Sequence, residues 1–215
     1  MAGAGGTSGG DAAAEGLSLG HELREAQRLL VTGDTRAAAQ HLRGVLARGS
    51  LPPAIDADAR YLLGRALSAS GDRDGAAEEW AAVLRLDAAD APSEPLLSPE
   101  EFESVAEAAL AELPQEHLDQ LGNVAIVVAE RPSPEMVADG IDPRILGLYH
   151  GVPMARRSVS FGAPYADTIH LFSANLERVS ATRAALVERI RIVVLHETAH
   201  FFGYTEAQLR RMGLV

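Results

Sequence analysis

The sequence predicts a chain of two parts, an N-terminal all-α part of helical-hairpin repeats and a C-terminal α/β (α+β) domain. Three observations support this fold class. Residues 18–90 contain an internal repeat of helical character, and the runs at 123–129 and 168–172 have the length and composition of strands. Residues 181–202 form a long, largely apolar helical segment that Gly203 ends. A helix of this kind is normally buried, so it predicts the core of the second part.

Shifts in composition divide the chain further. The first residues are rich in Gly, Ala and Ser, and Pro92 and Pro95 interrupt the helical period between the two parts. The expected segments are a disordered tail (1–17), the helical repeats (18–90), a linker (91–97) and the C-terminal domain (98–215).

Two Gly-Asp turns mark the N-terminal repeat. Gly33-Asp34 recurs as Gly71-Asp72, and Val45-Leu46 recurs as Val83-Leu84, each 38 residues later. A helical stretch lies on either side of each turn, so each copy is expected to form a helical hairpin.

The second copy resembles a tetratricopeptide repeat. The small and large positions of that family are filled by Leu63-Gly64, Leu67, Gly71, Ala76 and Trp80. The 38-residue spacing exceeds the family's length of about 34, and Ala88 stands where a closing proline is usual. The resemblance implies a surface that docks a protein partner. The alternative is a stacked helical domain alone, because independent solenoids usually have three or more repeats.

The C-terminal domain is expected to begin with a capped helix. Ser98 and Glu101 form a capping box with Pro99 at the first helical position, and the helix should reach about residue 112. The other expected elements are a short helix from Leu113-Pro114, a buried strand at 123–129, a mostly loop segment at 130–164 with short strands at 145–149 and 158–161, and a strand at 168–172.

Charge and composition exclude several classes of protein. The 19 basic and 30 acidic residues give a net charge of -11, which argues against binding to nucleic acid or to an anionic membrane. A peptide or protein partner is easier to accommodate. The absence of cysteine excludes disulfides and thiolate zinc sites, so a metal must be held by histidine and carboxylate. We find neither a signal-peptide pattern nor a membrane-spanning stretch and expect a cytoplasmic protein.

The long helix carries the HExxH pattern as His196-Glu197-Thr198-Ala199-His200. The two histidines are one turn apart and about 40° apart around the axis, so both imidazoles can reach one zinc ion. Glu197 stands beside them, where its carboxylate can act as the general base toward a zinc-activated water. The alternative is a pair of histidines packed in the core.

A catalytic zinc normally has three protein ligands and one open position. Glu206 is the only acidic residue after the HExxH motif, and no histidine follows the motif. On a continued helix Glu206 would project away from the histidine pair, but Gly203 can adopt a left-handed conformation and turn the chain back. The alternative is that Thr205 and Glu206 cap a short final helix at 207–212.

Residues 98–215 resemble the small zincin-like metallopeptidases sometimes called minimal zincins. The matching pieces are Leu113-Pro114, the strand at 123–128, the segment 146–153, the strand at 168–172 and the motif from His196 to Glu206. The resemblance implies an α/β fold with a small sheet packed on the active-site helix. It also implies a hydrolase acting on peptide bonds, with Zn2+ held by His196, His200 and Glu206.

Two functions from different classes compete. The leading hypothesis is a zinc-dependent peptidase whose N-terminal repeats dock a partner or substrate, and the other is a non-catalytic binding module with a structural or vestigial zinc site. In zincins a sheet edge near the metal often binds the substrate as an added strand, and Thr168–Phe172 is the candidate here. Tyr149 and Tyr204 are candidates for contacts with substrate or an oxyanion, against a simpler role as packed rings. The intact Glu197 favours the enzyme.

Overall fold

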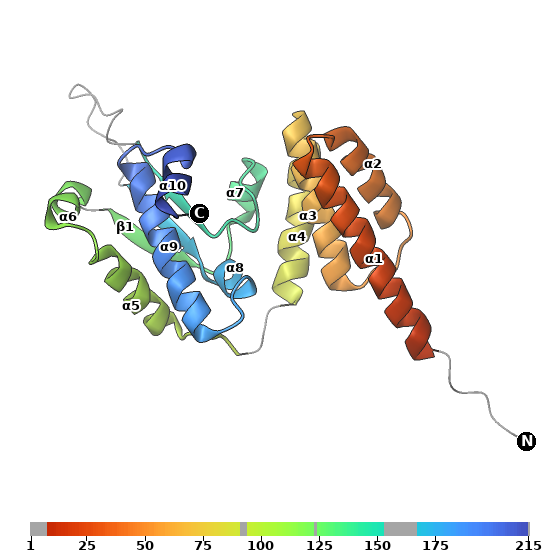
Figure 1. Cartoon of the computed structure of the whole chain (residues 1–215), viewed down its shortest axis with the longest axis horizontal. Coiled ribbons are helices and arrows are strands. Elements are labelled where there is room, and N and C mark those ends of the chain that lie inside the picture. Colours follow the sequence, from red (N-terminus) through yellow and green to blue (C-terminus); the bar gives the residue numbers. More distant parts are fainter. Residues whose placement is uncertain (1–7, 91–93, 123, 153–166, 215) are drawn as a thin grey trace, which may run out of the picture. The chain divides into compact units, whose positions relative to one another are not determined.

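The computed structural model describes residues 8–90, 94–122, 124–152 and 167–214. These residues are mostly helical and include a small three-stranded mixed sheet (Figure 1). They form two compact units by their internal contacts: the first comprises residues 1–91 and 133–143, and the second residues 92–132 and 144–215. The short strand expected at 158–161 and the first seven residues of the expected tail lie outside the described residues.

The first unit is built from consecutive helices joined by tight turns. Its helices are α1 (Ser8–Val31), α2 (Thr35–Leu46), α3 (Pro53–Ser70) and α4 (Arg73–Ala89). The two Gly-Asp turns separate α1 from α2 and α3 from α4, with positive φ angles of 82° at Gly33 and 89° at Gly71. Glycine adopts this conformation at little cost, and the aspartates that follow cap α2 and α4 by accepting backbone hydrogen bonds.

Residues 8–17, expected in the disordered tail, are instead helical and belong to α1. The run from Asp11 to Glu15 includes three consecutive alanines, which have the highest helix propensity. The helix therefore begins earlier than the hydrophobic pattern predicts.

Residues 133–143 belong to the first unit although they lie between two strands of the second in sequence. This segment contains α7 (Pro134–Ala138), and Val137 of α7 is buried in the core of the first unit. The hydroxyl of Tyr61 donates a hydrogen bond of 2.9 Å to Asp142 in the same segment. A region expected to be mostly loop thus supplies a short helix to the helical unit.

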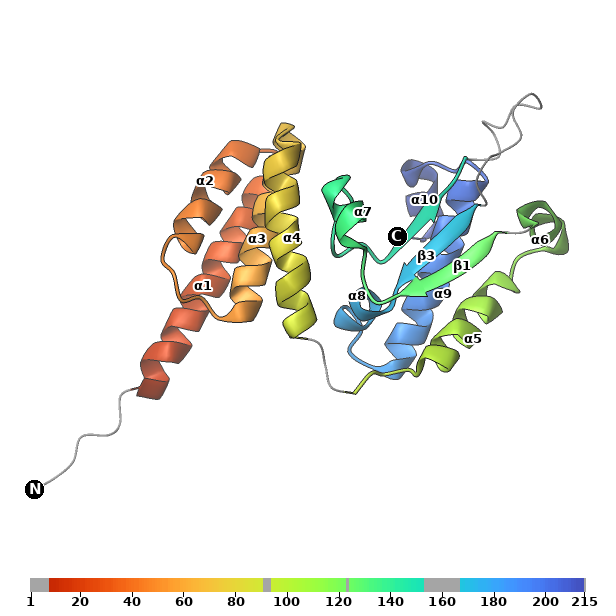
Figure 2. The same cartoon turned by 180° about the vertical axis from the view of Figure 1, so that it is seen from behind.

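The second unit contains a sheet in the order β1-β3-β2. Its strands are β1 (Ala125–Ala129), β2 (Gly147–His150) and β3 (Thr168–Phe172), and its helices are α5 (Pro99–Leu110), α6 (Gln115–Leu121), α8 (Ser173–Arg178), α9 (Arg183–Phe201) and α10 (Glu206–Met212). β3 pairs in parallel with β1 and antiparallel with β2. Helices α5 and α9 cover one face of the sheet (Figures 1 and 2), where apolar residues of α5, β3 and α9 form the core.

Two expectations about the strands are wrong. β1 is only partly buried, with Val127 40% exposed, because helices cover one face of this edge strand and its alternate residues point to the other face. β3 is the central strand of the described sheet, so it has no free edge for a substrate strand. β2 pairs with β3 on one side only among the described strands. No helix in the described part of the chain has both the length and the apolarity needed to cross a membrane.

Candidate metal centre

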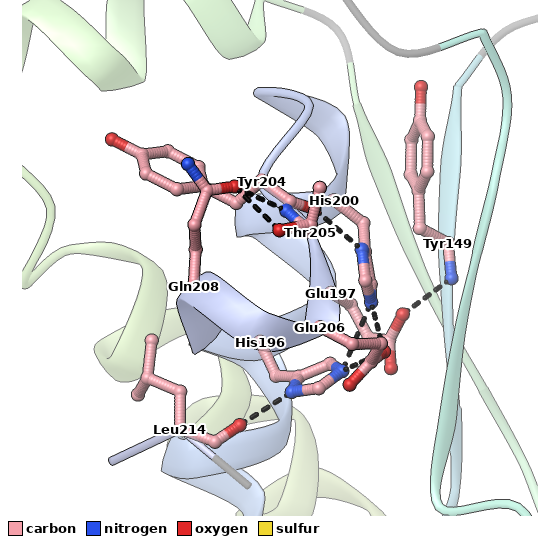
Figure 3. Close-up of polar contacts among 9 residues, drawn as sticks. All are labelled: Tyr149, His196, Glu197, His200, Tyr204, Thr205, Glu206, Gln208 and Leu214. Atoms are coloured by element: carbon pink, nitrogen blue, oxygen red, sulfur yellow. Dashed lines mark hydrogen bonds and ion pairs between the residues drawn. The ribbon is translucent and has the colours of Figure 1, made fainter. Parts of the chain in front are cut away.

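Helix α9 positions the HExxH residues by burying its apolar face. Thr182 caps its first turn, where its hydroxyl accepts a hydrogen bond from the Ala185 amide. The fully buried residues Leu186, Ile190 and Val194 then fix the helix against the core of the second unit. The last two turns therefore present His196, Glu197 and His200 at a defined place beside β2 (Figure 3).

The chain reverses immediately after α9. Gly203 has a φ of +86°, and the Tyr204 amide donates a 3.0 Å hydrogen bond to the Ala199 carbonyl, which closes the left-handed end of the helix. α10 begins at Glu206, and the Thr205 amide in front of it donates to Gln208 Oε1 at 2.8 Å. Glu206 is thus the first residue of a capped helix, and its carboxylate also faces the histidine pair. The two alternatives for Glu206, a metal ligand and a first-turn residue of the final helix, are therefore compatible in geometry.

Three acceptor atoms converge at this place (Figure 3). His196 Nε2 and His200 Nε2 are 3.1 Å apart, and Glu206 Oε1 lies 3.5 Å from the first and 3.2 Å from the second. Ligands about 2.05 Å from a tetrahedral zinc lie about 3.3 Å from one another. The triangle of His196, His200 and Glu206 therefore has the size of one face of a zinc coordination tetrahedron.

The hydrogen bonds of the two imidazoles determine where their protons lie. His196 Nδ1 is 2.5 Å from the Leu214 carbonyl oxygen, and His200 Nδ1 is 3.3 Å from the Tyr204 carbonyl oxygen. A carbonyl only accepts, so in the neutral rings each Nδ1 carries the hydrogen and each Nε2 presents a lone pair. Two lone pairs and a carboxylate oxygen then face one another, an arrangement that a cation stabilises. These residues fit a divalent cation that prefers nitrogen and oxygen ligands, such as zinc.

Glu197 lies between β2 and the histidine pair (Figure 3). It is only 8% exposed, and one carboxylate oxygen accepts a 2.8 Å hydrogen bond from the Tyr149 amide on β2. Burial raises the pKa of Glu197 above its usual value, and the Tyr149 hydrogen bond together with the nearby histidines opposes this rise. The strand thus orients the carboxylate while leaving its second oxygen available.

The three candidate ligands border a cleft of about 830 Å³ in the second unit. The cleft is lined by β2, by one face of α9 and by the turn before α10. The side chains of His196, His200 and Glu206 are 18%, 28% and 54% exposed. A substrate and water can therefore reach the ligand triangle.

Tyr149 and Tyr204 lie next to the triangle, but their hydroxyl groups point away from it (Figure 3). The Tyr149 hydroxyl donates a 2.6 Å hydrogen bond to Asp167, and Tyr204 is 39% exposed. Both residues serve the site through their backbones, Tyr149 through its amide and Tyr204 through its carbonyl.

Two contributors to the site were not foreseen in the sequence. The Leu214 carbonyl has no signature in residue type, because any residue supplies a carbonyl. Gly147 offers a signal, since a glycine inside a strand often marks a close approach of the backbone. A Cβ at this position would lie 2.5 Å from Val193 Cγ1 and 3.0 Å from Glu197 Cγ.

Comparison with known proteins covers only part of the chain. No curated protein matches it at a significant level. Residues 121–214 match the family described as zincin-like metallopeptidase, a span that includes the three strands, α9, α10 and the ligand triangle but neither α5 nor the N-terminal helices. The match supports zinc as the metal, a hydrolase acting on peptides, and a peptide or protein as substrate. Residues 121–214 are therefore similar to the zincin-like metallopeptidases.

Proposed function

We propose that this chain is a zinc-dependent peptidase in which His196, His200 and Glu206 bind the metal and Glu197 is the general base. The observation that carries this proposal is the convergence of three acceptor atoms within 3.5 Å of one another, with a buried carboxylate beside them. A site with a purely structural role would need no such carboxylate, so its presence favours the enzyme over a non-catalytic binding module.

Zinc bound at this triangle supplies a Lewis acid that polarises the substrate carbonyl and makes a water molecule more acidic. Glu197 takes a proton from the attacking water, whose oxygen forms a bond to the carbonyl carbon. As the carbon–nitrogen bond breaks, Glu197 passes the same proton to the leaving nitrogen. Its burial suits both steps, because the raised pKa makes the carboxylate a better proton acceptor than an exposed glutamate.

The edge of β2 that faces away from β3 is the proposed binding edge for the substrate. The Leu146 carbonyl accepts a hydrogen bond from the Phe172 amide, so Leu146 faces β3. Backbone groups alternate along a strand, which directs those of Gly147 and Tyr149 to the opposite edge. The Tyr149 amide reaches Glu197 on that side, and the backbone groups of Gly147 there can pair with an extended peptide.

The N-terminal helices are proposed to dock a protein partner or substrate as tetratricopeptide-like repeats. The candidate surface is a groove of about 490 Å³ in the first unit, whose lining includes Glu22, Gln40 and Arg48. A bulky Gln40→Trp substitution in the groove should slow cleavage of protein substrates and leave short peptides unaffected. If the substitution changes the cleavage rate of neither protein substrates nor short peptides, docking through this groove is contradicted.

The catalytic proposal is tested by metal analysis combined with peptide cleavage. Purified protein is expected to contain one zinc per chain and to cut members of a peptide library, whereas Glu197→Ala should retain the zinc and cut none. If zinc is bound but the two proteins show the same cleavage pattern, the alternative of a binding module with a structural or vestigial site is preferred. If the purified protein holds no stoichiometric metal, both the catalytic proposal and the alternative with a structural or vestigial zinc site fail.

A further inference from the structure

Arg189 lines the same cleft and has no assigned role. It lies on α9 seven residues before His196, which places both residues on the same side of the helix. Its side chain is half-buried and forms no ion pair with any described residue. Arg183 and Arg191 on the same helix, by contrast, pair with Glu101 and Glu112 at 2.9 and 2.7 Å.

No carboxylate of the described residues lies within ion-pair distance of Arg189. The neighbouring Glu188 is directed to Arg191, at 3.4 Å. A half-buried guanidinium in a largely apolar cleft is stabilised by an anion, so the missing partner indicates a ligand that supplies one.

Contacts between β2 and α9 define the direction of the cleft. Gly147 packs on Val193, and two residues later the Tyr149 amide bonds to Glu197, one helical turn further along. The two elements therefore run in the same direction along the cleft. The ligand triangle lies near the end of β2, whereas Ile145 and Arg189 line the cleft before the strand begins.

A substrate strand on β2 is expected to be antiparallel, the more stable pairing. Its residues after the cut bond then run from the ligand triangle toward Arg189. Seven helical residues span about 10 Å along the axis, and an extended peptide covers about 3.3 Å per residue. Arg189 is thus within reach of the second or third residue on the leaving side.

We propose that Arg189 binds a carboxylate of the substrate two or three residues beyond the cut bond, so that the enzyme prefers peptides that are acidic at this place. This inference rests on the proposed function, because it takes the cut bond to lie at the metal triangle. The carboxylate belongs either to an Asp or Glu side chain or to the C-terminus of a short substrate, and both can form a bidentate pair with a guanidinium. The net charge of -11 does not prevent this, because charges farther than about 8 Å are screened at physiological salt.

Peptide hydroxamates test the proposal without depending on turnover. The hydroxamate group binds zinc and fixes the register, and the succinyl unit takes the place of the first residue after the cut bond. A succinyl-type hydroxamate followed by Ala-Glu or Ala-Gln therefore places its last residue third, near Arg189. Each probe is made as the amide and as the free acid, which separates a side-chain carboxylate from a C-terminal one. Affinities are measured on the zinc-loaded full chain, on Arg189→Gln, on Arg189→Glu and on the control Arg210→Gln, an exposed arginine outside the cleft lining.

At least one acidic probe should bind the wild type about tenfold more tightly than the neutral amide. Arg189→Gln should remove this preference and leave the neutral probe unchanged, Arg189→Glu should reverse it, and Arg210→Gln should preserve it. Equal affinities of all probes for the wild type would overturn the role of Arg189 while leaving the metal centre intact. If no hydroxamate binds zinc-loaded protein, the proposed function fails and this inference falls with it.

Discussion

Gly147 is the residue at which a single added methyl group should damage both the fold and the site. Its Cβ would lie 2.5 Å from Val193 Cγ1 and 3.0 Å from Glu197 Cγ. Carbon atoms in ordinary contact are about 3.5–4.0 Å apart. Gly147→Ala must therefore move β2 and α9 apart by about 1 Å, or displace the Glu197 side chain that lies between them.

The expected cost follows from this displacement. Overpacking of a core typically costs about 1–3 kcal/mol, and each kcal/mol lowers the melting temperature of a domain of this size by about 4–8 °C. We therefore expect a loss on the order of 10 °C. The same movement lengthens the 2.8 Å hydrogen bond from the Tyr149 amide to Glu197. A misplacement of about 1 Å should reduce kcat/KM by about a hundredfold.

Thermal unfolding and kcat/KM on a cleaved peptide are the assays, with zinc content measured in parallel. Val193→Ala removes the methyl group that clashes, so the double variant should recover part of the stability and rate lost in Gly147→Ala. Val193→Ala alone is the matched control, because it measures the stability lost through the cavity that this substitution leaves. Wild-type stability and rate in Gly147→Ala would refute the close-contact argument, as would a double variant whose losses are the sum of the two single ones.

Four further predictions concern the proposed metal ligand Glu206, the general base Glu197 and the contact that orients His196. Glu206→Gln should weaken zinc binding by more than about a hundredfold, because losing a ligand costs more than losing its supporting hydrogen bond, and competition with a chromophoric chelator measures this. Glu197→Gln should lower the hydrolysis rate by about 10²–10⁴-fold with little change in zinc affinity. Because burial raises the pKa of Glu197, the metal-free wild type should lose stability as the pH rises from the usual pKa of 4.5 through the raised pKa of the folded state. Melting temperatures at pH 5 and pH 8 measure this loss, which should be smaller in Glu197→Gln. A chain ending at Gly213 lacks the Leu214 carbonyl that orients His196 and should bind zinc about 10–100-fold more weakly.

Matched controls separate these effects from general damage. Glu188→Gln removes an exposed glutamate from α9 and should leave zinc affinity unchanged. A chain ending at Leu214 keeps the oxygen acceptor for His196, so it should bind zinc like the full chain. Unchanged zinc affinity in Glu206→Gln would remove that residue from the ligand set. The same result for the chain ending at Gly213 would show that the Leu214 contact is dispensable.

Local signals account for much of the site. The apolar segment predicted at 181–202 is found as α9. It is predictable because its buried residues and the glycine that ends it lie within one continuous stretch of sequence. The placement of Glu206 also followed from a local property, the left-handed freedom of Gly203. Both features depend on residues within a few turns of each other, which is the range over which a sequence pattern determines conformation.

Long-range pairing explains what local signals left open. β2 and β3 are both short apolar strands, and nothing within either strand shows which one lies in the centre of the sheet. Strand order depends on contacts between segments far apart in the chain, as does the packing of Val137 in the first unit. For the same reason, residue type alone predicts a role for the Tyr149 hydroxyl. The hydrogen bond from its amide to Glu197 depends on which edge of β2 faces α9.

The triangle of His196, His200 and Glu206 links the proposed metal binding to the position of α10. α9 is held by a broad apolar core, whereas α10 has seven residues and buries Leu209 as its fully enclosed side chain. Bringing the Glu206 carboxylate to within 3.5 Å of two imidazole lone pairs is electrostatically unfavourable without a cation. The proposed cation would therefore stabilise the position of α10, and through the Leu214 carbonyl the following residues orient His196. In the proposed site, the metal and the segment from Glu206 to Leu214 would thus each keep the other in place.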